Sequence, residues 1–193
     1  MTSSSSTDRT RFEGLCKILQ FNWPFYLVGG ILLTAGILVL ILLQNVLPSI
    51  LLLMGIAGVT LAAWWLVASL IASHWIYDRT GIYDFEWLEI EAPEKAAILT
   101  AGFDEAASGL LRKWPKSDWT YYDFYEKETM SEPSIQRARK LYPPSEQWLP
   151  CPALAWPCAD DSFDLIVFPF SAHELRKPEE RTRLLQEARR SIR

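Results

Sequence analysis

The sequence predicts an α/β protein in which an N-terminal transmembrane helical hairpin precedes a parallel sheet flanked by helices. No Asp, Glu, Lys or Arg occurs between Lys17 and Asp78, whereas charged residues are frequent on both sides of this zone. Beyond it, short apolar runs alternate with helical patterns, as in parallel sheets joined by helical crossovers. We therefore expect a cytoplasmic segment over residues 1–24, a membrane part over residues 25–73 and a cytoplasmic α/β domain over residues 74–193.

Composition narrows the classes of function. The 193 residues carry a net charge of -4, and the acidic excess lies after the charge-free zone. An acidic domain repels phosphate groups, so we expect no nucleic-acid partner. The histidines are His74 and His173, which excludes a His-rich metal site, and we predict no metal. The odd cysteine count, with Cys16, Cys151 and Cys158, favours reduced thiols over disulfides.

The first predicted element at the N-terminus is a short helix at the membrane surface. Residues 1–10 are rich in Ser and Thr, which predicts disorder. Apolar side chains then recur at helical spacing, at Phe12, Leu15, Cys16 and Leu19. This pattern favours a helix in the membrane interface ahead of the first span.

Two apolar stretches, residues 25–43 and residues 50–72, are each close to the roughly 20 residues that a helix needs to cross a bilayer. The six residues between them include Gln, Asn and Pro, which favour a tight turn. The alternative is a pair of buried core helices, but the rest of this short chain could not cover so much apolar surface. We therefore predict an integral membrane protein with the lipid bilayer as a partner.

Basic residues indicate the orientation of the hairpin. They flank its open end, at Arg9, Arg11, Lys17 and Arg79, while the turn between the spans has no charge. Positive charge favours the cytoplasmic side, so we expect both termini in the cytoplasm. Because the spans have no charged side chain for an ion pathway, we interpret the hairpin as an anchor.

Strands and helices alternate in the second half of the chain. The predicted strands cover residues 96–102, 119–123 and 163–168. The predicted helices cover residues 104–113, 134–141 and 178–192. Residues 142–158 contain five prolines and predict a loop. We expect the strand at residues 163–168 to be central, because it is apolar on both faces.

Candidate site residues gather at the carboxyl ends of these strands, where parallel sheets bind ligands. Gly102 permits a sharp turn, and amides at the start of the next helix can face an anionic group. Asp123 follows 21 residues later, close to the roughly 20-residue offset of a ribose-binding acid in nucleotide-binding folds. Alternatively, Asp123 only ends a strand. Histidine suits proton transfer near neutral pH, so His173 is a candidate general base, or alternatively a capping or packing residue.

These residues resemble class I S-adenosylmethionine-dependent methyltransferases over about residues 94–193. The resemblance rests on residues 98–123, and more strongly on the Ala-Asp-Asp-Ser-Phe-Asp-Leu-Ile stretch at 159–166 and on residues 171–181. It implies a partial Rossmann-like sheet, S-adenosylmethionine as cofactor and methyl transfer to an acceptor. It also implies that Gly102 binds the amino acid part of the cofactor, that Asp123 binds its ribose and that His173 faces the substrate. Asp104, in the Ala-Gly-Phe-Asp loop after the first strand, joins the cofactor-binding candidates.

The sequence also departs from the family pattern. The first loop keeps one glycine, no acid stands in residues 149–157, and the sequence ends where relatives continue into further strands. We therefore expect an open sheet edge, marginal stability of residues 82–193 and association at that edge with a protein partner or a second copy. Two functions stay open. One is a membrane-anchored methyltransferase with a lipid or membrane-associated acceptor, and the other is a non-catalytic membrane protein whose methyltransferase-like domain binds a partner.

Overall fold

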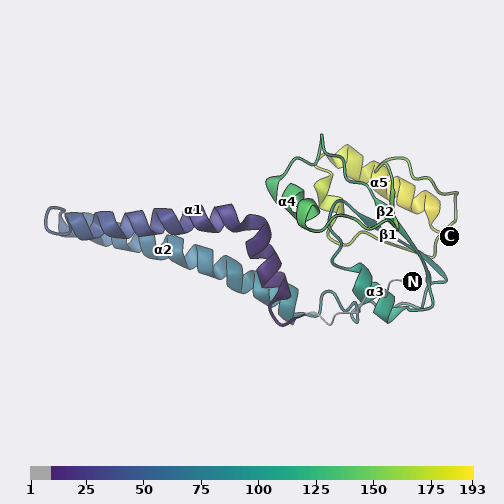
Figure 1. The fold of residues 1–193 in the computed structure, drawn as a ribbon, viewed down its shortest axis with the longest axis horizontal. Helices are drawn as coiled ribbons and strands as arrows, with labels where there is room; N and C mark the ends of the chain where they lie inside the picture. Colours follow the sequence, from purple (N-terminus) through teal and green to yellow (C-terminus); the bar gives the residue numbers. More distant parts are fainter. Residues whose placement is uncertain (1–9) are drawn as a thin grey trace. The chain divides into compact units, whose positions relative to one another are not determined.

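The fold comes from a computed structural model that describes residues 10–193 (Figure 1). The chain divides into two compact units, Met1–Gly81 and Ile82–Arg193. The disorder predicted for residues 1–10 falls, apart from Thr10, outside the described residues. Each unit is built from its own elements.

The first unit is a hairpin of two long helices (Figure 1). Helix α1 spans Glu13–Leu43 and helix α2 spans Ser49–His74, and a π-helical turn at Trp75–Arg79 continues α2. Both helices are long and apolar enough to cross a membrane, and no residue of their most apolar stretches is buried. The predicted pair of long apolar helices is therefore present in the structure.

Helix α1 bends before its most apolar part. Asn22 departs from helical geometry, with φ −117° and ψ 18°, two residues before Pro24. A proline ring clashes with the carbonyl four residues earlier and removes a backbone donor, which kinks a helix. Residues 13–21 thus form a separate helical piece where the sequence predicts an interfacial helix. Its position at a membrane surface stays a prediction.

A buried carboxylate closes the open end of the hairpin. Asp78 accepts hydrogen bonds from the backbone amides of Gly14 at 2.6 Å and Leu15 at 3.1 Å, and lies 2.9 Å from Nδ1 of His74. Only 1% of the Asp78 side chain is exposed. The amides belong to the first turn of α1, whose donors have no partner within the helix. Asp78, just after α2, therefore holds the start of α1 by accepting from two amides that would otherwise need water as a hydrogen-bond partner.

The second unit is built on a four-stranded parallel sheet in the order β3-β2-β1-β4. The strands are β1 at Lys95–Thr100, β2 at Asp118–Asp123, β3 at Trp148–Pro150 and β4 at Leu165–Val167. Lys95 pairs with Asp118 and Thr100 with Asp123, so β1 and β2 end at the same edge. The strand order reverses beside β1, and ligands of open α/β sheets bind at such a switch point.

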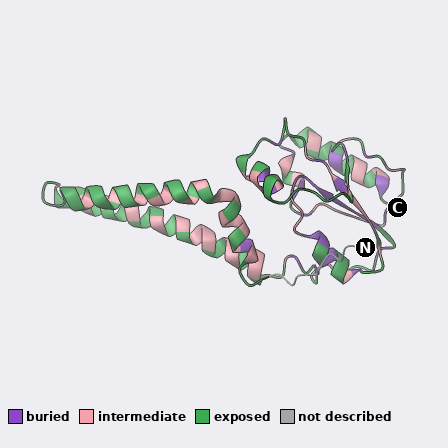
Figure 2. Ribbon diagram, in the orientation of Figure 1, coloured by how far each residue is buried: buried purple, intermediate pink, exposed green. Residues whose placement is uncertain are grey.

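Helices cover both faces of this sheet (Figure 1). They are α3 at Ala107–Lys113, α4 at Pro133–Leu141 and α5 at Pro178–Ser191, with a 3₁₀ turn at Ala172–Glu174. Alternate residues of β1 serve two cores, because successive side chains of a strand point to opposite faces. Leu99 packs in one core with residues of α4 and α5, while Ile98 packs in the other with α3. Figure 2 shows the buried residues concentrated in this unit.

The structure corrects two expectations about the sheet. Strand β3 lies within residues 142–158, which the sequence predicts as loop, because Trp148 and Leu149 find pairing partners on β2. Its proline is the last residue of an edge strand, a position where proline is tolerated. The strand predicted over residues 163–168 as central is the three-residue edge strand β4, half-buried and paired with β1 among the described strands.

The chain after α5 returns to the beginning of β4. Ile192 forms a parallel bridge with Phe163, and the amide of Arg193 donates to the Phe163 carbonyl at 2.9 Å. The Arg193 guanidinium forms ion pairs with Asp164 and with Glu94, the latter at 3.0 Å. The outer edge of the sheet is therefore contacted at Phe163, while Leu165–Val167 have no described strand on that side.

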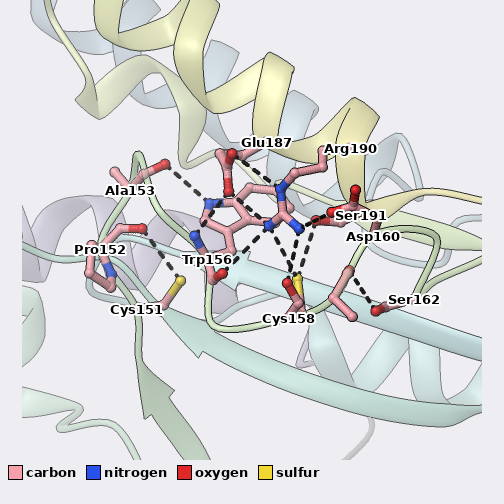
Figure 3. Close-up of polar contacts among 11 residues, drawn as sticks. Cys151, Pro152, Ala153, Trp156, Cys158, Asp160, Ser162, Glu187, Arg190 and Ser191 are labelled. Carbon is pink, nitrogen blue, oxygen red and sulfur yellow. Dashed lines mark hydrogen bonds and ion pairs between the residues drawn. The ribbon is translucent and has the colours of Figure 1, made fainter.

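The proline-rich loop after β3 is tied to α5 by a cluster of polar contacts (Figure 3). Arg190 donates from Nη1 to the Cys158 carbonyl at 3.0 Å and to Asp160 at 2.7 Å, and from Nη2 to Glu187 at 2.9 Å. Glu187 in turn accepts from the Trp156 amide at 3.0 Å. The contacts give this loop a defined path beneath the helix without secondary structure of its own.

Candidate functional site

Three of the four predicted site residues line one pocket at the carboxyl edge of β1 and β2. They are Gly102, Asp104 and Asp123. The pocket holds about 250 Å³ and is also lined by Phe103, Arg139, Tyr142 and Trp148. The loop after β1 and the segment between α4 and β3 therefore supply its main walls, with Asp123 at the end of β2 and Arg139 of α4 between them.

Gly102 follows β1 in a backbone conformation that favours glycine, with φ +128°. A Cβ atom here would lie 3.0 Å from Cγ1 of Ile135 and 3.2 Å from Cγ of Arg139. Both neighbours belong to α4, which packs directly on this turn. The turn and this close packing explain the glycine, and its role toward a cofactor stays a prediction.

Asp104 stabilises the start of helix α3. Its Oδ1 accepts hydrogen bonds from the amides of Ala106 at 2.9 Å and Ala107 at 2.8 Å. A carboxylate in this position satisfies amides that lack partners within the helix. The helix consequently begins at Ala107, later than the predicted start at residue 104. The sequence predicts that amides at the start of this helix can face an anionic group. The amides of Ala106 and Ala107 instead donate to Asp104.

Asp123 ends β2 with both carboxylate oxygens engaged. Oδ1 accepts from the Tyr125 amide at 3.1 Å, and Oδ2 lies 2.8 Å from Nη1 of Arg139. The side chains of Asp123 and Arg139 are 12% and 21% exposed. The buried Nη1 atom has no partner with hydrogen-bond geometry, so its contact with Asp123 is an ion pair without good alignment.

Arg139, in the last turn of α4, is a site residue that the sequence pattern does not predict. Its guanidinium carbon stands 4.2 Å from the centre of the Tyr125 ring, in addition to the ion pair with Asp123. Basic residues at a helix C-terminus are commonly explained by the helix dipole. No local signal separates Arg139 from its basic neighbours Arg137 and Lys140, because its role depends on how α4 packs on the sheet.

Aromatic side chains were also missed as pocket residues. The pocket residues Phe103 and Tyr142 have rings 4.9 Å apart, and the ring of the pocket residue Trp148 lies 5.2 Å from that of Tyr121, which does not line the pocket. Burial, and secondarily the carboxylate of Asp104, raise the pKa of the Tyr121 hydroxyl. Phe103, directly after Gly102, is the one sequence signal that could have indicated aromatic side chains in the pocket.

His173 lies outside this pocket. It belongs to the 3₁₀ turn that follows β4, its side chain is 71% exposed, and its Nε2 atom lies 3.2 Å from Glu174. Burial, with a smaller contribution from Glu132, raises the pKa of the Glu174 carboxyl, while the nearby His173 opposes this shift. The structure therefore does not bring His173 together with Gly102 and Asp123, and its catalytic role stays a prediction.

Comparison with known protein families matches residues 121–193 to a family described as a methyltransferase domain. The second unit is a class I methyltransferase-like domain. The matched part begins within β2 and includes Asp123, α4 and His173, while Gly102 and Asp104 precede it. Comparisons with curated proteins and with solved structures found no match.

The methyltransferase match points to S-adenosylmethionine as the cofactor to consider. The pocket contains residue types that can bind its parts. A glycine turn, a carboxylate at the end of β2 and aromatic side chains meet at the carboxyl edge of the sheet. The volume of about 250 Å³ is below the roughly 300–1,000 Å³ of typical ligand pockets. The residues are therefore of the right chemical kinds for the cofactor, but with α4 packed on Gly102 the pocket is smaller than typical ligand pockets.

Proposed function

We propose that the protein is a membrane-anchored methyltransferase that binds S-adenosylmethionine in this pocket and methylates a lipid or a membrane-associated acceptor. The observation that carries the proposal is the convergence of Gly102 and Asp123 on one pocket, in a unit that matches a methyltransferase domain. The two helices long enough to span a bilayer support an acceptor at the membrane, because an anchor confines the search to its surface.

Each site residue has a proposed task. Asp123 accepts hydrogen bonds from the ribose hydroxyls, and the backbone at Gly102 and Asp104 borders the amino acid part of the cofactor. Bound S-adenosylmethionine supplies an electrophilic methyl group. Methyl transfer can be achieved by proximity and alignment without a strong base. His173, exposed after β4, is available to contact the acceptor or to take a proton from it.

The proposed topology places both termini in the cytoplasm. Arg11 and Lys17 precede the first apolar stretch, and Arg79 follows the second. Positive charge next to short membrane segments favours the cytoplasmic side. The methyltransferase-like unit would then act at the cytoplasmic face of the membrane.

A second candidate function is partner binding without catalysis. It is favoured by the internal contacts of Asp104 and Asp123, whose carboxylates already have partners within the chain. It is also favoured by the edge position of β4, because an exposed strand edge can pair with another chain. In this reading the partner, a protein or a second copy, docks along β4.

Calorimetric titration of the full chain in detergent with S-adenosylmethionine separates the two functions. We expect saturable binding, weakened by about 1–3 kcal/mol in Asp123→Ala, the cost of losing hydrogen bonds to a charged group. Asp118→Ala is the matched control, because Asp118 is an exposed acid at the opposite end of β2. Unchanged affinity in folded Asp123→Ala would place Asp123 outside the site. No binding by the wild type would favour the second candidate.

A further inference from the structure

We propose that Arg139 and helix α4 form a latch, here called the Arg139 latch, which holds the pocket closed by occupying Asp123. Cofactor entry then requires Arg139 to leave Asp123. The inference rests on the proposed function, because it concerns access to the same site. Removing a residue that binds the cofactor weakens cofactor binding. Removing Arg139 from a latch strengthens cofactor binding.

Arg139 competes with a cofactor ribose for the carboxylate of Asp123. A ribose diol presents two hydroxyl donors to a carboxylate, and here Oδ1 of Asp123 accepts from the Tyr125 amide while Nη1 of Arg139 lies 2.8 Å from Oδ2. The Arg139 contact is the stronger competitor, because both side chains are largely buried and oppositely charged. A ribose cannot approach Oδ2 along the direction that the guanidinium occupies.

Helix α4 is held over the glycine turn by close contacts. Ile135 contacts Gly102 so closely that a Cβ atom would lie 3.0 Å from Cγ1 of Ile135. Beyond the end of the helix, Tyr142 packs against Phe103, which follows Gly102. These contacts hold α4 against the loop after β1. In the proposed function this loop borders the amino acid part of the cofactor.

Arg139 has a second contact that it can keep when the latch opens. Leaving Asp123 separates two largely buried, oppositely charged side chains, which costs free energy and keeps the closed state favoured. The guanidinium also lies over the Tyr125 ring and can keep this cation–π contact when the ion pair breaks. Because Arg139 can keep the contact with Tyr125 in the open state, its movement away from Asp123 can be reversible.

The latch has a quantitative consequence. If the pocket accepts cofactor only when open, the apparent dissociation constant equals the intrinsic one divided by the open fraction. Removing the charge of Arg139 raises that fraction and therefore tightens binding. We expect S-adenosylmethionine to bind Arg139→Gln about five- to thirtyfold more tightly than wild type, which corresponds to about 1–2 kcal/mol.

The test is a calorimetric titration of full-length wild type, Arg139→Gln and Lys140→Gln in detergent with S-adenosylmethionine. Lys140→Gln is the matched control, because Lys140 is an exposed cation on the same turn of α4 and does not line the pocket. It should bind within about twofold of wild type, since exposed charges contribute little. Hydrogen exchange should show faster exchange of α4 amides in Arg139→Gln than in Lys140→Gln.

The outcomes separate the latch from the proposed function. Binding by wild type that is equal to or tighter than binding by folded Arg139→Gln overturns the latch and leaves the proposed function intact. No binding by any of the three proteins overturns both. If Arg139→Gln fails to fold, Arg139→Met keeps the aliphatic stem against Gly102 and should give the same increase in affinity. Unchanged α4 exchange in the folded variant would also contradict the latch.

Discussion

The hairpin and the methyltransferase-like unit are both rich in apolar residues, but they bury them differently. Among the described residues of α1 only Gly14 is buried, and α2 has no buried residue. In β1, by contrast, every residue from Ala96 to Thr100 is buried by the rest of its own unit. The apolar side chains of the hairpin helices are therefore not buried by their own unit, whereas the sheet unit buries those of β1.

The two units also use a buried or half-buried carboxylate in the same way. Asp78 satisfies two amides at the start of α1, and Asp104 satisfies two amides at the start of α3. In the hairpin this contact joins elements far apart in sequence, whereas in the sheet unit it is local. In both units, a carboxylate of the chain accepts hydrogen bonds from amides at the start of a helix. Such a contact does not by itself indicate a ligand site.

The largest expected effect comes from separating the units. Full-length protein should stay with membranes after an alkaline wash, because the proposed anchor would bury its apolar surface in lipid. Residues 82–193 alone should appear in the soluble fraction. Sedimentation followed by immunodetection measures both. Residues 82–193 that sediment as fully as the whole chain would show that the membrane contact lies in the sheet unit instead.

A smaller effect is expected from adding one methyl group in each unit. A Cβ at Gly109 in α3 would lie 1.9 Å from the Tyr83 carbonyl oxygen, whereas one at Gly58 in α2 meets no atom within 4 Å. Gly109→Ala should lower the free energy of unfolding by about 3 kcal/mol, the upper range for overpacked interiors. Gly58→Ala should leave it unchanged. Near-ultraviolet circular dichroism of full-length protein during heating gives the comparison.

A Gly109→Ala protein that melts with the wild type would mean that the Tyr83 carbonyl does not lie against Gly109. A Gly58→Ala protein with lower stability or altered association would mean that this glycine faces another helix. Either result would weaken the contrast between a closely packed sheet unit and an openly packed hairpin.

The smallest expected effect is a dependence on acid pH to which two carboxylates of the sheet unit contribute. Hydrogen bonds from Arg193, and then from the Lys95 amide, hold the pKa of Asp164 below its usual 3.8. Arg190, and then the Trp156 amide, hold the pKa of Glu187 below 4.5. Because these pKa values are depressed on folding, the stabilisation is present above pH 4.5 and is lost as pH falls through the folded values.

Thermal unfolding of the full chain between pH 3 and pH 7 measures this dependence. The unfolding midpoint should fall below about pH 4.5, and Glu187→Gln should flatten part of the fall. Glu179→Gln is the control, because Glu179 is an exposed acid at the start of the same helix. A decline of equal size in Glu187→Gln would place the acid sensitivity elsewhere.

Much of the candidate site was predictable because it depends on local features. Gly102 and Asp123 follow apolar runs that are easily recognised as strands, and parallel strands end at a common edge. Arg139 could not be predicted, because its contact with Asp123 depends on α4 folding back onto the glycine turn. Strand β3 was missed for a similar reason, since three residues among prolines become a strand only through pairing with β2.

By itself the sequence determined the division into an apolar hairpin and an alternating α/β unit, because charge distribution and hydrophobic period are properties of neighbouring residues. It also determined which residues end the first two strands. Only the tertiary structure decided that β4 is an edge strand and that His173 lies away from the pocket. It alone decided that Arg139 occupies Asp123, because long-range packing, and not local preference, sets which side chains meet.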